Sequence, residues 1–229
     1  MSRPDALTWL TNLNALAGGL FLLVTFALVA LRQVRGCVRL YVAQSVLLAV
    51  SALLLGAIYQ TWHLYAVGIL DFATKAVIIP WLLGRTLRAE AYPRREITQV
   101  LNIPTALLIA LGLAITAYFL AQPMLAADHE PTIAANLPIG LAGLLIGALT
   151  VVVRREALPL FLGLLAMENS AFFAGIALAP EMPLMAEVSV AFDVLVVVFV
   201  ASILTGAVRE HLGTTEVGRL TALREGAEV

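Results

Sequence analysis

Seven apolar stretches, each long enough to cross a lipid bilayer as a helix, take up most of this sequence. They run near residues 10–32, 37–60, 64–87, 102–122, 136–153, 157–179 and 186–208. About 20 consecutive apolar residues span the hydrocarbon core as a helix, and a spanning helix satisfies its own backbone hydrogen bonds. The sequence therefore predicts an all-α fold, a polytopic membrane bundle of about seven transmembrane helices.

The composition excludes a soluble catalytic domain. Hydrophobic residues make up 61% of the chain, charged residues make up 13%, and the mean hydropathy is +0.96, whereas about 25% of residues are charged in a typical soluble domain. The chain has one cysteine, Cys37, so it can form neither an internal disulfide nor a cysteine-ligated iron–sulfur or zinc site. His63, His129 and His211 lie at or beyond the ends of the stretches, which argues against bound haem. We expect a chain without catalytic residues, metal or cofactor of its own.

Two further features concern the ends of these stretches. The first stretch, from about Leu10 to Leu31, is longer than the apolar part of a signal peptide, and its N-terminal flank is nearly uncharged. The arginines gather in alternate connections, which are cytoplasmic under the positive-inside rule. They are Arg32, Arg35 and Arg39, then Arg85, Arg88, Arg94 and Arg95, then Arg154 and Arg155, then Arg209, Arg219 and Arg224. The rule predicts a multi-pass protein of the plasma (inner) membrane, with its N-terminus outside and its C-terminus cytoplasmic.

Two stretches carry residues that interrupt or tighten helix packing. The fifth stretch begins near Asn136 and is short, and its Gly143 and Gly147 form a pattern that permits close helix approach. The third stretch contains Pro80, which frees a backbone carbonyl and predicts a bend.

Four ionisable residues lie inside the apolar stretches: Asp71, Lys75, Glu168 and Asp193. A charged side chain at the bilayer centre costs roughly 2.5–3.5 kcal/mol on insertion scales, so such residues usually serve a function. Lys75 is the only lysine in the chain, and desolvation can remove the proton of a lysine but not that of an arginine. Asp71 precedes it by four residues and shares its helix face. The two can exchange protons, or they can form a self-neutralised pair that only tolerates burial.

Glu168 and Asp193 lie in the sixth and seventh stretches, which a short loop joins. We expect these helices to pack antiparallel, so that both carboxyls face one interior proton path. The alternative is that hydrogen bonds from Asn169, Ser170 or Ser189 hold the carboxyls without a transport role. Counted from the ends of their stretches, Lys75 and Glu168 lie at nearly the same depth, which favours lateral proton movement along the midplane.

Several segments resemble the hydrogenase-4 component E family over nearly the whole chain. They are Thr11-Asn12-Leu13, Tyr41-Val42-Ala43-Gln44-Ser45, Phe72-Ala73-Thr74-Lys75 followed by Pro80, Met167-Glu168-Asn169, and His211-Leu212-Gly213-Thr214-Thr215-Glu216 through Leu220-Thr221-Ala222-Leu223. The last three spans of that family are similar to the K-type subunit of respiratory complex I, which carries a carboxyl in each of two adjacent spans. Glu168 matches the first of these carboxyls. Asp193 matches the second approximately, with aspartate in place of the usual glutamate.

The resemblance implies a division of the chain and a set of partners. Residues 1–125 would form an N-terminal four-helix membrane region with Asp71 and Lys75. Residues 130–210 would form a three-helix K-subunit-like region with Glu168 and Asp193, and residues 211–229 a cytoplasmic tail. The partners would be antiporter-like membrane subunits and a hydrogenase or other soluble redox module, with nickel–iron and iron–sulfur centres on those partners only. No nucleic-acid partner is expected.

Three functions remain open from the residues. The chain can contribute its buried charges to a proton or sodium translocation path within such a complex. It can instead be a structural anchor whose charges pair with those of partner subunits. A stand-alone secondary transporter is the third reading, but such folds often show internal repeats and paired broken helices, and the sequence has one proline-bearing span and no convincing repeat.

Overall fold

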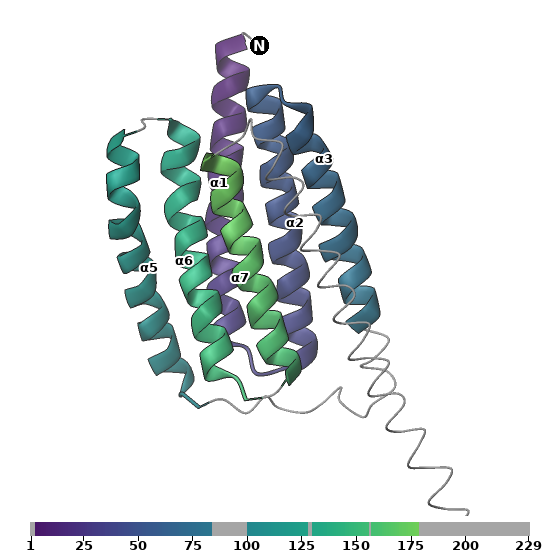
Figure 1. Cartoon of the computed structure of the whole chain (residues 1–229), viewed down its shortest axis with the longest axis vertical. Helices are drawn as coiled ribbons and strands as arrows, with labels where there is room; N and C mark the ends of the chain where they lie inside the picture. Colours follow the sequence, from purple (N-terminus) through teal and green to yellow (C-terminus); the bar gives the residue numbers. More distant parts are fainter. Residues whose placement is uncertain (1–2, 84–99, 128–129, 156, 179–229) are drawn as a thin grey trace, which may run out of the picture.

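The computed structural model describes residues 3–83, 100–127, 130–155 and 157–178, and these form a bundle of long helices (Figure 1). The elements are α1 (Arg3–Ala30), α2 (Val34–Tyr59), α3 (Trp62–Asp71), η1 (Phe72–Ile78), α5 (Ile103–Ala127), α6 (Pro131–Val153) and α7 (Ala157–Leu178). No β-strand occurs in these ranges. The all-α prediction is confirmed for this part of the chain.

Six helices in the described ranges are long and apolar enough to cross a membrane. The third of them, Trp62–Leu83, comprises α3, η1 and a short helical continuation. These six correspond to the first six predicted stretches. The seventh stretch (186–208), with Asp193 and Ser189, and the tail (211–229) lie outside the described residues.

The fifth predicted stretch is longer than its apolar pattern indicated. Its helix α6 begins at Pro131 and not near Asn136, and it runs for 23 residues with Pro138 inside it. Pro131 lies at the first helical turn, where the missing N–H costs no hydrogen bond. A full helical turn thus precedes Asn136, and this turn carries the polar Thr132.

The irregularity expected near Pro80 takes the form of a π-helix. η1 covers the seven residues before Ile79, and the Ile79 N–H bonds the carbonyl of Thr74. A proline has no N–H and its ring clashes with the carbonyl four residues earlier, so a regular α-helix is unfavourable around Ala76. Short π-helical segments within α-helices are rare and often occur at functional sites.

Helices α1, α2, α6 and α7 form the centre of the bundle. α6 packs along α7, α1 contacts both α2 and α6, and α2 contacts α7. In Figure 1, α5 lies at one edge beside α6, and α3 lies at the other edge beside α2. Because α1 contacts α6 and α2 contacts α7, these four helices share one packed interior.

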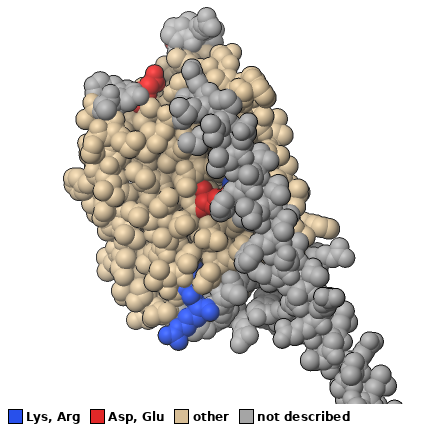
Figure 2. All heavy atoms as spheres, viewed as in Figure 1, with Lys and Arg blue, Asp and Glu red and all other residues tan. Residues whose placement is uncertain are grey.

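The two ends of the bundle differ in which helices begin there. At the upper end, in the orientation of Figure 1, α1 and α6 begin; at the lower end, α2 and α7 begin. On the face shown in Figure 2, basic side chains gather mainly at the lower end, and acidic ones appear at the upper end and at mid-height. The remaining surface is largely uncharged, as lipid contact requires.

Glycines set the close approach of α6 to α7. A methyl group on Gly147 would lie 2.8 Å from the backbone of Met167, and one on Gly140 would lie 2.6 Å from the backbone nitrogen of Ala174. The glycine pattern predicted to allow close packing therefore does so. It fixes the position of the part of α7 that carries Glu168.

Candidate functional site

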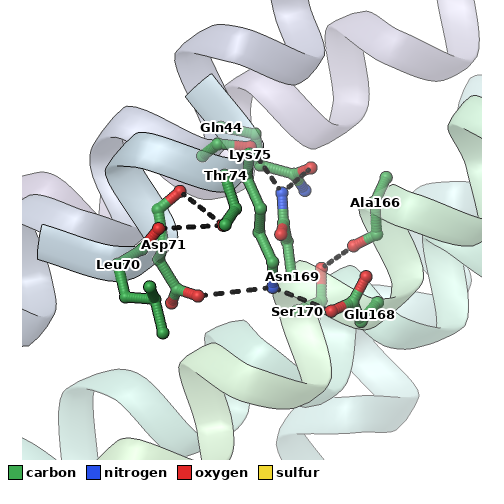
Figure 3. Close-up of polar contacts among 10 residues, drawn as sticks. Gln44, Leu70, Asp71, Thr74, Lys75, Ala166, Glu168, Asn169 and Ser170 are labelled. Atoms are coloured by element: carbon green, nitrogen blue, oxygen red, sulfur yellow. Dashed lines mark hydrogen bonds and ion pairs between the residues drawn. The ribbon is translucent and has the colours of Figure 1, made fainter. Parts of the chain in front are cut away.

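The centre of the described bundle holds an ion pair between two helices. The Nζ atom of Lys75, on η1, lies 2.8 Å from Oε1 of Glu168, on α7 (Figure 3). The Lys75 side chain is fully buried, and 10% of the Glu168 side chain is exposed. The two residues had been placed at equal depth from the sequence, and the contact agrees with that placement.

Asp71 supplies a second carboxylate to the same lysine. Its Oδ1 lies 3.7 Å from Lys75 Nζ, and the aspartate side chain is 1% exposed. The Lys75 ammonium also lies 5.2 Å from the ring centroid of Phe172, at a distance suited to a cation–π contact. We call Asp71, Lys75 and Glu168 the central ion cluster. Three of the four ionisable residues singled out from the sequence belong to it.

The π-helix carries the lysine of this cluster. Lys75 lies within η1, and Asp71 is the last residue of the preceding α-helix. The Thr74 hydroxyl donates to the backbone carbonyl of Leu70 at 2.9 Å, so it satisfies a backbone acceptor in the turn where the helix changes type. The local sequence thus places one cation where it reaches both its own helix and α7.

Polar side chains beside the central ion cluster form a second group, the Gln44 layer. Asn169 Nδ2 donates to Ser45 Oγ at 3.0 Å and more weakly to Gln44 Oε1 at 3.5 Å. Gln44 Nε2 in turn donates to Thr25 Oγ1 at 2.9 Å. These bonds join α1, α2 and α7 through side chains that are buried in the described structure.

Asn169 and Ser170, which the alternative reading of the sequence paired with the buried carboxyls, hydrogen-bond other partners. Asn169 bonds α2, and the Ser170 hydroxyl donates to the backbone carbonyl of Ala166 at 2.7 Å. The two side chains therefore do not hold the Glu168 carboxylate through hydrogen bonds, and the nearest charged atom to that carboxylate in the described residues is Lys75 Nζ. Ser189, the third expected support, lies outside the described residues.

A third buried group, the Asn136 layer, was not singled out from the sequence. Ser51 Oγ donates to Asn14 Oδ1 at 2.7 Å, and Asn14 Nδ2 donates to Asn136 Oδ1 at 3.0 Å. All three side chains are fully buried, and they come from α1, α2 and α6. Single Asn or Ser residues in an apolar stretch carry little signal on their own. Ser51 does lie one heptad after Gln44, so the two share a helix face.

Arg154 is buried although the sequence placed it among the loop arginines. It is 4% exposed, and its Nη2 donates to the backbone carbonyls of Leu28 at 2.8 Å and Leu31 at 2.7 Å. The last carbonyls of a helix have no partner within the helix and attract cations. Arg154 therefore caps the C-terminal end of α1 and ties the start of the α6–α7 connection to it.

Asp193 lies outside the described residues, so its distance from Glu168 stays a prediction. Within the described ranges, no group of three or more His, Cys, Asp or Glu residues is placed to hold a metal ion. The central ion cluster has one cation between two carboxylates, which suits ion pairing and proton exchange.

The comparisons with known proteins agree with the sequence motifs. The uncharacterized protein Rv0085 of Mycobacterium tuberculosis is 35% identical over 210 residues, which cover 91% of this chain and 94% of that protein. Hydrogenase-4 component E of Escherichia coli K12 is 28% identical over 216 residues, which cover 92% of this chain and 96% of that protein, and the Shigella flexneri protein of the same description matches equally.

The comparisons with family models and with solved structures gave no match. The two groups of relatives match almost end to end, so the similarity extends over both the region with Lys75 and the region with Glu168. The distant similarity to hydrogenase-4 component E supports the family indicated by the sequence motifs. The chain belongs to the family that includes the Mycobacterium tuberculosis protein Rv0085.

Proposed function

We propose that the chain is a non-redox membrane subunit of a hydrogenase-4-like complex, and that its central ion cluster forms part of a proton translocation path. The similarity to hydrogenase-4 component E and the six apolar helices suggest the first part, a multi-pass membrane subunit of a hydrogenase-type complex. The second part rests on one observation, the 2.8 Å contact between Lys75 and Glu168 across two helices.

Charge balance gives this contact its chemical meaning. One ammonium and two carboxylates carry a net charge of −1 when all three are ionised, and their side chains are 0%, 1% and 10% exposed for Lys75, Asp71 and Glu168. Buried charge is costly unless it is compensated. Binding one proton neutralises the cluster, and releasing it leaves a carboxylate that Lys75 still partners. The cluster thus has a proton that it can take up and pass on at modest cost.

Asp193 would extend this path. The resemblance to K-type subunits implies that it would be a second carboxyl, on the span after α7, sharing the interior with Glu168. Protons would then move laterally from Asp71 and Lys75 through Glu168 to Asp193. Antiporter-like partner subunits would continue the row of charged groups on either side, and a hydrogenase or other redox module would drive the movement.

The exposed arginines support the sidedness of the path. Arg32, Arg35, Arg39 and Arg155 are exposed at the lower end of the bundle, and arginines near the ends of spans favour the cytoplasmic side. The lower end in Figure 1 would therefore face the cytoplasm, and the upper end would face outward. The C-terminus would lie on the cytoplasmic side, after the seventh span.

Two isosteric or truncating substitutions test the proposal. Glu168→Gln keeps the shape of the side chain and removes its proton-carrying group, and Lys75→Ala removes the shared cation. We expect both variants to leave the chain in the membrane complex and to lower redox-driven proton uptake in inverted vesicles. Asp5→Asn is the matched control, because Asp5 is an exposed acidic residue outside the cluster. Normal pumping by both cluster variants would refute the proposal.

The structural-anchor reading predicts a different result from the same variants. If the charges only hold partner subunits in place, Glu168→Gln and Lys75→Ala should release subunits, and native gel electrophoresis of the solubilised complex would show this loss. The geometry favours the translocation reading, since the cation and both carboxylates already pair within this chain. An assembled complex that fails to pump would decide for translocation.

A further inference from the structure

Along α1, α2 and α7, an apolar side chain lies on the helix face between the Gln44 layer and the Asn136 layer. On α1 the order is Asn14, Phe21 and Thr25, with intervals of seven and four residues that keep all three on one helix face. The ring of Phe21 is fully buried. With a rise of about 1.5 Å per residue, Phe21 lies roughly 10 Å below Asn14 and 6 Å above Thr25.

The neighbouring helices supply the rest of the same apolar layer. On α2, Leu48 lies between Gln44 and Ser51, and on α7, Phe173 lies one turn above Asn169. Phe21, Leu48 and Phe173 are fully buried and belong to one hydrophobic cluster. The two rings stack with centroids 4.6 Å apart and planes 23° apart. An apolar layer therefore separates two hydrogen-bonded polar layers, which lie about 10 Å apart along α2.

Contacts with glycine positions place the rings against both polar layers. A methyl group on Gly18 would lie 3.4 Å from Cζ of Phe173 and 3.6 Å from Oδ1 of Asn136. One on Gly143 would lie 3.4 Å from Cε1 of Phe21 and 2.5 Å from Oγ of Ser170. The Phe173 ring thus approaches the Asn136 layer, and the Phe21 ring approaches the residue that follows Asn169.

Above the Asn136 layer, polar side chains continue to the upper end of the bundle. Thr132 precedes Asn136 by one turn of α6, and its Oγ1 hydrogen-bonds the hydroxyl of Tyr59. That hydroxyl also donates to Glu130 Oε2 at 3.4 Å, and Glu130 is exposed. Polar groups spaced in this way can hold bridging waters.

We propose that the Phe21–Phe173 stack is a hydrophobic gate between the central ion cluster and a hydrated proton route to the upper end of the bundle. The route runs from the Gln44 layer past the two rings to the Asn136 layer, and then through Thr132 and Tyr59 to Glu130. Apolar constrictions block water and protons by dewetting. One part of this proposal rests on the proposed function, namely that the central ion cluster on the inner side of the gate carries protons.

A passive leak measurement tests the gate without redox turnover. Phe173→Ala and Phe21→Ala are produced in the full chain within its native membrane complex. Inverted vesicles are acidified by their own ATPase, the ATPase is inhibited, and a pH-sensitive acridine dye reports the collapse of the gradient. We expect a several-fold faster collapse in both variants than with the unsubstituted chain. Adding Asn136→Leu to Phe173→Ala should return the rate to its original value.

Matched variants separate a gate from packing damage. Phe161 is a buried phenylalanine on the same helix, in the hydrophobic cluster of the lower end, so Phe161→Ala should not leak. Phe173→Leu refills the layer with another apolar side chain and should not leak either. A tight gradient in both alanine variants, with normal amounts of chain in the membrane, would overturn the gate. An equal leak in Phe161→Ala would also overturn it.

The two proposals fail separately. A leak in Phe173→Ala and Phe21→Ala together with normal redox-driven pumping by Glu168→Gln would refute the proposed function. The gate on the route to the upper end would still stand. Lost pumping by Glu168→Gln together with no leak in Phe173→Ala or Phe21→Ala would refute the gate and leave the proposed function.

Discussion

Replacing Lys75 with methionine should destabilise the folded chain much more than removing the whole central ion cluster. Methionine keeps the length of the lysine side chain and removes its charge. In Lys75→Met, Asp71 and Glu168 remain with side chains 1% and 10% exposed and without their shared cation. The triple variant Asp71→Leu/Lys75→Met/Glu168→Met replaces all three charged side chains with apolar ones of similar volume.

The size of the effect follows from the burial of the cluster. Removing one partner of a buried ion pair costs about 3–5 kcal/mol, whereas replacing a whole buried ionic group with hydrophobic residues of similar volume is often neutral or stabilising. We expect Lys75→Met to lose about 3–5 kcal/mol and the triple variant to regain most of it. Taking up protons also neutralises the stranded carboxylates and is easier at low pH, so the loss should shrink as the pH falls.

Thermal unfolding of the solubilised complex compares the stabilities of these variants. A fluorescent tag on the chain reports the fraction that still elutes in the assembled peak after heating, and the three single variants, the doubles and the triple complete the cycle. Asp5→Asn serves as the exposed control. A triple variant as unstable as Lys75→Met would refute the reasoning, since the loss would then come from the shape of the site and not from its charge.

Two further predictions concern the packing around the site. Gly147→Ala should lose about 1–3 kcal/mol by overpacking, because its methyl group would lie 2.8 Å from the Met167 backbone. Gly112→Ala should lose nothing, because its methyl group would have no atom of another helix within 4 Å. Equal melting temperatures of the two variants would contradict this. Arg154→Met should lose about 1–3 kcal/mol, because it removes the side-chain donor of the Leu28 and Leu31 carbonyls at the C-terminal end of α1. Arg155→Met, at an exposed position, is its control. Thermal melting of the tagged complex measures both pairs, and an Arg155→Met loss as large as that of Arg154→Met would count against the capping role.

The apolar length of the stretches was enough to predict six of the described helices. Five of these six stretches exceed the about 20 residues that the bilayer core requires, and the fifth comes close to that length. A bilayer leaves few alternatives to a helix. The start of α6 was misplaced because Thr132 and Asn136 looked like the polar edge of a span. In the structure they hydrogen-bond Tyr59 and Asn14, so polar groups at this depth find partners on other helices.

The residues of the central ion cluster could be found from the sequence, but their geometry could not. Charge in an apolar stretch is conspicuous, which identified Asp71, Lys75 and Glu168. The spacing of Asp71 and Lys75 predicted their pairing, and the pair is present at 3.7 Å. Nothing in the spacing showed that Lys75 lies nearer to Glu168, because that contact depends on how η1 and α7 pack.

Pro80 and Gly147 explain how this contact is held. Pro80 disfavours a regular α-helix over the preceding turns, and the π-helix that forms there carries Lys75. Gly147 lets the backbone of α7 approach α6 at Met167, directly before Glu168. One partner of the ion pair is thus placed by an irregular helix and the other by close helix packing.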